Sequence, residues 1–122
     1  MSDQGMVPPP GRERDAAIAL ALGWTKSCWD DGTFIHLEDA YPCVDHPRHW
    51  STSDATAVQL LSEATKRGWV WVVATDDPDG VCAMMDYNPS LDKAMPIHQH
   101  ARTIADAVSA AFLAAHTEST HA

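Results

Sequence analysis

The few positively charged and protonatable side chains gather directly before two segments with helical periodicity. A helix N-terminus exposes unpaired N–H groups and a partial positive charge, so Arg and His beside it favour an anion. Tyr41 and Trp50 add aromatic rings on which a nucleobase could stack. The sequence therefore predicts binding of a small phosphorylated or nucleotide ligand. The candidate ligand-binding residues are Tyr41, His46, Arg48, His49, Trp50, Ser51, His98, His100, Arg102 and Thr103.

An alternative interpretation gives these residues no ligand. In it, Asp54 and Asp106 already satisfy the two helix starts, and the Arg and His side chains only balance an acidic surface. Catalysis has little support, because Cys43 with His46 is the one local pair of thiol and base. The chain also lacks a nucleophile elbow, a phosphate loop and the Rossmann glycine pattern. We therefore expect that it is not an enzyme.

Histidine and cysteine also raise the question of a metal. Cys43, His46 and His49 offer a thiolate and two imidazoles, and His98 and His100 would project from one strand face about 7 Å apart. However, the sequence contains no CxxC pair and its ligand spacings are irregular. We therefore expect no bound metal, no cofactor and, in particular, no structural zinc.

Composition excludes several classes of protein. The 122 residues suit a single domain, which we place at residues 11–116 between disordered tails at residues 1–10 and 117–122. Eight Lys and Arg against seventeen Asp and Glu give a net charge of -9, which argues against general binding of DNA or RNA. Neither a membrane helix nor a signal peptide is expected, and three cysteines do not suggest a disulfide framework. We therefore expect a cytoplasmic protein without a membrane partner.

Periodicity and turn residues predict three helices and five strands. The most clearly amphipathic helix begins near Ser51 and ends before Gly68, with one apolar face that includes Leu60 and Leu61. The acidic residues 76–80 are typical of a hairpin turn. The predicted elements are a helix at 11–22, a hairpin at 24–37, a loop at 38–50, the helix at 51–67, a second hairpin at 69–87, a short strand at 97–102 and a helix from 103 to 115.

The strand at residues 69–75, WVWVVAT, is apolar on both of its alternating faces. Such a strand needs cover on both faces, so we expect a central strand between helices. Met84 and Met85 are expected to fill the core, and Trp69 and Trp71 to lie in the core or at an oligomer contact. The predicted fold is α+β, a three-layer α/β/α sandwich with a mainly antiparallel sheet in the order α-β-β-α-β-β-(β)-α. Val72→Asp should then unfold the domain.

Three segments resemble the signature blocks of the phage α-β-α (ABA) sandwich domain family of small bacteriophage and prophage proteins. They are RDAAIALALGW at 14–24, HWSTSDATAVQLLSEATKRGW at 49–69 and ARTIADAVSAAFLAA at 101–115. The resemblance implies a phage origin and an α-β-α sandwich, and it transfers no catalytic residue. This sequence departs from the family pattern where Trp50 leads the middle block and Ser53 precedes Asp54.

Two functions are compatible with these observations. In the first, the chain is a non-enzymatic phage accessory protein that sequesters a small anionic or nucleotide ligand in the bacterial cytoplasm, as a nucleotide sponge in host-defence evasion. The analogy is one of size and implied origin. In the second, its acidic surface binds a basic host or phage protein, as an inhibitor or adaptor. A homo-oligomer is compatible with either function.

Overall fold

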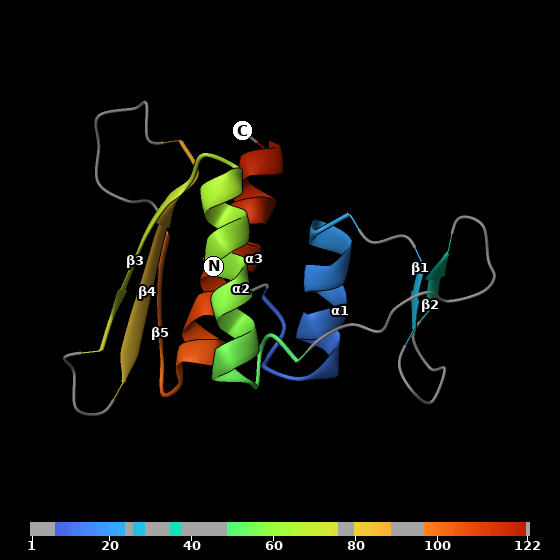
Figure 1. Cartoon of the computed structure of the whole chain (residues 1–122), viewed down its shortest axis with the longest axis horizontal. Helices are drawn as coiled ribbons and strands as arrows, with labels where there is room; N and C mark the ends of the chain where they lie inside the picture. Colours follow the sequence, from blue (N-terminus) through green and yellow to red (C-terminus); the bar gives the residue numbers. More distant parts are fainter. Residues whose placement is uncertain are drawn as a thin grey trace.

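Figure 1 shows the computed structural model of the chain, which describes residues 7–23, 26–28, 35–37, 49–75, 80–88 and 97–121. Within these residues the predicted α+β class and element order are confirmed, including the short strand before the last helix. The elements are α1 (Arg12–Ala21), β1 (Lys26–Cys28), β2 (Ile35–Leu37), α2 (Asp54–Lys66), β3 (Val70–Ala74), β4 (Val81–Asp86), β5 (Ile97–Ala101) and α3 (Ile104–His121).

The two predicted hairpins are both present as antiparallel pairs. β1 pairs with β2, and β3 pairs with β4, which in turn pairs with β5 to give a three-stranded sheet in the order β3-β4-β5. β4 is therefore the central strand of this sheet, and β3 has one neighbour among the described strands. In the register of the sheet, Met84 lies between Val72 on β3 and His98 on β5.

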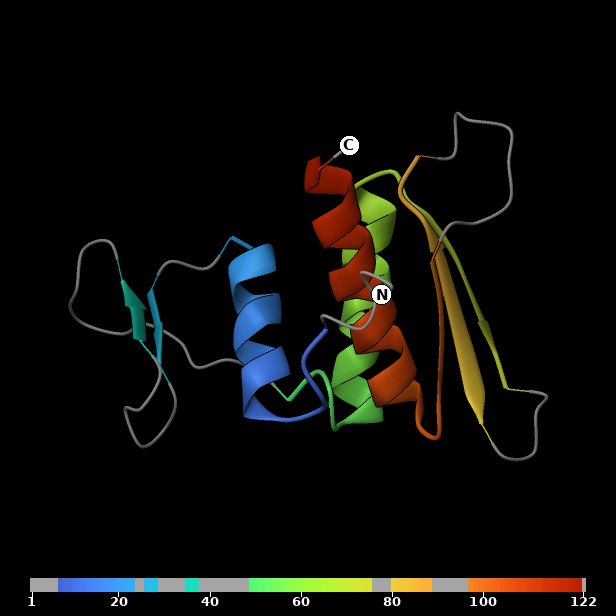
Figure 2. The ribbon, with the colours of Figure 1, turned by 180° about the vertical axis from the view of Figure 1, so that it is seen from behind.

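The helices of the described chain all lie on the same side of the three-stranded sheet (Figures 1 and 2). α3 packs on β4 and β5, α2 packs on β3, and α1 lies beyond them against α3. The order from the sheet outward is thus one layer of strands, the pair α2 and α3, and then α1 (Figure 2). A three-layer α/β/α sandwich is not confirmed, because no described helix covers the second face of the sheet.

The expectation that residues 69–75 form a central strand with helices on both faces is wrong. β3 lies at one side of the sheet, and Val70 and Val72 are 48% and 43% exposed. Met84 also belongs to this second face and is half-buried, whereas Met85 is fully buried as expected. Alternating apolar residues indicated two apolar faces correctly, but they could not show whether a helix of the same chain covers both.

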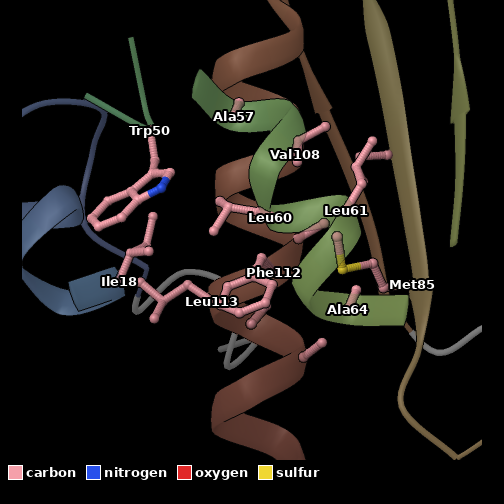
Figure 3. Close-up of a cluster of buried hydrophobic side chains, with 14 of the residues drawn as sticks. Ile18, Trp50, Ala57, Leu60, Leu61, Ala64, Met85, Val108, Phe112 and Leu113 are labelled. Atoms are coloured by element: carbon pink, nitrogen blue, oxygen red, sulfur yellow. The ribbon is translucent and has the colours of Figure 1, made fainter. Parts of the chain in front are cut away.

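The core lies between the sheet and the pair α2 and α3, and it continues between that pair and α1 around Ile18 and Trp50 (Figure 3). The apolar face of α2 supplies Leu60 and Leu61, and the alanine-rich α3 approaches the sheet closely around Phe112. Trp69 packs on the Phe112 ring with centroids 5.5 Å apart. Trp71 is 37% exposed, and its indole Nε1 donates to the Thr65 hydroxyl on α2 at 3.0 Å. The predicted core position of Trp69 is thus confirmed, and Trp71 lies at the edge of the core.

Two of the three described helices, α1 and α2, end where a glycine was expected to stop them. Gly23 and Gly68 come after α1 and α2 with φ of 87° and 83°, a region that glycine adopts without strain. α3, by contrast, continues to His121, beyond residue 116 where we expected the domain to end. Glu118 accepts from the Tyr87 hydroxyl at 3.2 Å, which links the added turn to the residue that follows β4. At the other end, the Pro8 carbonyl accepts from Arg14 at 2.7 Å, within the expected tail.

Candidate functional site

The start of each described helix lies at the same end of the molecule, with the three helices pointing the same way (Figure 1). Their N-terminal N–H groups would attract an anion, but side chains of the chain already bind such groups at the starts of α2 and α3. Ser53 Oγ accepts from the Thr56 N–H at 3.4 Å, and Thr103 Oγ1 accepts from the Asp106 N–H at 3.0 Å. Asp54, the first residue of α2, accepts at 2.8 Å from the N–H of Ala105 in α3. These helix starts therefore offer fewer donors than the sequence suggested.

A buried guanidinium also reaches the start of α3, and sequence reasoning missed it. Arg14 is 5% exposed and its Nη1 lies 2.6 Å from Asp106 Oδ1. The same nitrogen donates to the Asp106 carbonyl at 3.0 Å and to the Ser109 hydroxyl at 3.1 Å. Its position four residues before buried Ile18 puts Arg14 on the inward face of α1, which is the signal that could have found it. The guanidinium stabilises the fold here rather than remaining available to a ligand.

Two of the predicted ligand residues belong to the interior instead. Trp50 is 1% exposed and packs near Ile18 in the core, so its ring does not face solvent (Figure 3). Ser51 is equally buried, its N–H donates to Asp15 Oδ1 at 2.9 Å, and its Oγ accepts from the Gly11 N–H at 2.8 Å. Burial raises the pKa of Asp15, and the hydrogen bonds from Ser51 oppose that rise. Ser51 and Asp15 thus fasten the start of α1 to the segment before α2.

The remaining predicted ligand residues fall into two groups. Tyr41, His46 and Arg48 lie outside the described residues, as do Cys43 and the acidic turn at 76–79, so those predictions remain predictions. The other predicted ligand residues are exposed. His49 lies before α2, and four more lie around the junction of β5 and α3, namely His98, His100, Arg102 and Thr103.

The second face of the β3-β4-β5 sheet is the other candidate site, and we name it the open face. The residues of the open face alternate along each strand with the residues that face the core. At one end of the open face Asp86 is buried, and its Oδ1 accepts from the Asn88 N–H at 2.9 Å. Cys82 Sγ lies 3.7 Å from His100 Nε2 across the β4-β5 pair. The described residues of the open face are Val70, Val72, Ala74, Cys82, Met84, Asp86, His98 and His100.

The open face therefore combines exposed apolar side chains with sulfur and imidazole groups. Within the described residues, no group of three or more His, Cys, Asp and Glu side chains is placed to hold a metal ion. Among the described helices, none is long and apolar enough to cross a membrane. No protein-family model, curated protein or solved structure matches the chain, so the resemblance to the phage ABA sandwich family remains a prediction.

Proposed function

We propose that the chain is a small non-enzymatic protein-binding module that docks another protein on its open face. The observation that carries this proposal is the exposure of Val70 and Val72, at 48% and 43%, on a sheet face that no described helix covers. Neighbouring apolar side chains on one surface favour burial against another apolar surface. This proposal places the function in the adaptor class that the acidic composition allowed.

The exposed valines of the open face supply only part of the energy that a specific contact needs. Full burial of a valine side chain is worth about 1.5–3 kcal/mol, so burying the exposed half of Val70 and Val72 gives roughly 2 kcal/mol together. β3 adds the hydrogen-bonding groups along its outer edge, which can pair with an incoming strand. Apolar side chains and backbone groups therefore support a partner that contributes an extended, apolar segment.

Charge narrows the chemistry of that partner. Among the described residues of the open face none is an exposed acid, whereas the whole chain carries a net charge of -9. An anionic lipid surface or a polyanion would be repelled at long range, while a basic protein would be attracted. The expected partner is a protein that presents an apolar segment flanked by Lys or Arg, from the host or from a phage if the predicted origin holds.

A photoreactive amino acid at one position of the open face tests this proposal. Position 72 should give a cross-linked adduct with one defined partner in cells that carry the gene, and the adduct should disappear in the Val70→Asp background. Position 58 is the matched control, because Val58 is 50% exposed and belongs to α2, outside the open face. Equal adducts from positions 58 and 72, or no adduct at position 72, would overturn the proposal.

We also propose a second candidate function, the anion or nucleotide binding predicted from the sequence. It is favoured by the exposed His98, His100 and Arg102 next to Thr103 at the start of α3. Loss of one charge-assisted hydrogen bond costs about 1.5–3 kcal/mol, so Arg102→Ala should weaken nucleotide binding about tenfold or more. Lys66→Ala, at the exposed end of α2, is the control. Titration calorimetry with a panel of nucleotides decides, and absence of binding at millimolar concentration refutes this candidate.

A further inference from the structure

Four sulfur and imidazole side chains form two adjacent cross-strand pairs on the open face. Cys82 pairs with His100, and Met84 pairs with His98, in the register of β4 and β5. Directly opposed residues of an antiparallel pair have Cβ atoms about 4.5–5.5 Å apart, and residues two apart on a strand about 7 Å. Thiol, thioether and imidazole groups thus meet within the reach of their own side chains.

The contact between Cys82 and His100 has the spacing of two ligands on one metal ion. Their Sγ and Nε2 atoms are 3.7 Å apart. Metal bonds of about 2.3 Å to sulfur and about 2.05 Å to nitrogen put those atoms about 3.6 Å apart at a tetrahedral angle and about 3.8 Å apart at a trigonal angle. A metal could therefore bind this pair with little movement of either strand.

We propose that Cys82, Met84 and His100 bind a soft monovalent metal ion, Cu(I), at the surface of the open face. Cys82 supplies a thiolate, His100 supplies its Nε2 atom, and Met84 supplies a thioether from the next position on the same face of β4. His98 lies opposite Met84, and the site does not require it. Binding replaces the thiol proton of Cys82 by the metal and releases that proton, with no change of oxidation state.

The ligand types select Cu(I) over zinc. Thiolate and thioether sulfur are soft ligands that favour Cu(I), whereas a structural zinc site usually needs four nitrogen or thiolate ligands. The described residues gather no such set, and thioether sulfur contributes little to zinc binding. The proposal departs from the expectation of no bound metal, although it keeps the expected absence of structural zinc. It also differs from a folding site, because the core forms on the opposite face of the same strands.

Competition with bicinchoninate, a coloured chelator of Cu(I), tests the proposal on the full chain under anaerobic, reducing conditions. The wild-type protein should withdraw one Cu(I) per chain. Cys82→Ser should weaken binding by more than about 100-fold, the upper limit seen when a residue that only orients a ligand is lost. His100→Asn and Met84→Leu should each weaken it by about 10-fold or more. X-ray absorption should show both sulfur and nitrogen around the copper.

The other two cysteines provide matched controls. Cys28→Ser and Cys43→Ser make the same chemical change at cysteines that the proposed site does not use, and both variants should keep the wild-type affinity. The proposal is overturned if either control loses the metal while Cys82→Ser keeps it, or if all three serine variants bind equally. It is also overturned if the affinity only matches that of a simple thiol, which would leave the Cys82–His100 contact as a hydrogen bond. Val70→Asp removes a docking contact at a position opposite Asp86 rather than opposite a proposed ligand, so it should leave copper bound and keep this result independent of protein docking.

Discussion

The ion pair between Arg14 and Asp106 allows a direct test of what stabilises the start of α3. The Arg14 side chain is 6% exposed and that of Asp106 is 32% exposed, so the two members of the ion pair differ in their access to water. Asp106→Ala leaves a buried guanidinium without its counter-charge, which should cost about 3–5 kcal/mol. Arg14→Met leaves a carboxylate that water can reach and that the α3 N-terminus stabilises, so it should cost about 1–3 kcal/mol.

Urea unfolding followed by far-UV circular dichroism measures both changes. The midpoints of the two ranges differ by about 2 kcal/mol, with Asp106→Ala the less stable variant, because an unpaired buried charge costs more than lost hydrogen bonds. Lys66→Met and Glu13→Ala remove exposed charges as controls and should each cost about 1 kcal/mol or less. If Arg14→Met costs more than Asp106→Ala, or both cost no more than the controls, the ion pair does not stabilise the start of α3.

Three further predictions concern the two faces of the sheet and the helix pair. The Val72→Asp variant should stay folded and lose about 1 kcal/mol or less of unfolding free energy, because the new carboxylate would face water. Thermal denaturation checks this. An unfolded variant would show that another part of the chain covers the open face. Leu60→Ala should cost about 2–5 kcal/mol in the same experiment, since Leu60 is 1% exposed in the core, and a cost near zero would contradict the packing. Burial, and next the charge of Arg67, lower the pKa of His116 from 6.5, so the folded protein binds fewer protons there than the unfolded chain. The free energy of unfolding should therefore fall as the pH drops from 6.5 through the lower pKa of folded His116, and His116→Asn should remove this fall. The same pH dependence of stability in the wild type and in His116→Asn would contradict this explanation.

Local patterns were enough for the elements but not for their arrangement. The spacing of Leu60, Leu61 and Ala64 predicted α2, and Gly68 predicted its end, because both signals act within a few residues of the chain. The alternation of β3 predicted two apolar faces, and the structure has both. Which face receives the helices depends on contacts between α3 and the sheet, and a single strand carries no information about them.

The candidate site shows the same division between local and distant effects. Thr103 was expected at the start of α3, and the hydrogen bond that its hydroxyl accepts from the Asp106 N–H confirms this. A Ser or Thr directly before a helical apolar stripe is therefore enough to locate a helix start from the sequence. Ser51 was expected at a ligand site, but it bonds to Asp15 and Gly11 from the other end of the domain. Arg14 likewise meets Asp106 across 92 positions of sequence. Such partners follow from packing, and no local pattern identifies them.

The two proposals on the open face can be separated because a strand divides its residues between two surfaces. Ala83 and Met85 of β4 face the helices and are buried, whereas Cys82 and Met84 face outward. A substitution at an outward position removes a ligand or an apolar contact while the buried set stays intact. Val72 lies opposite the proposed ligand Met84, whereas Val70 lies opposite Asp86, so Val70 is the position at which docking can be changed without a substitution beside the metal site. A loss of both properties from one outward substitution would therefore mean that partner and metal occupy a common site.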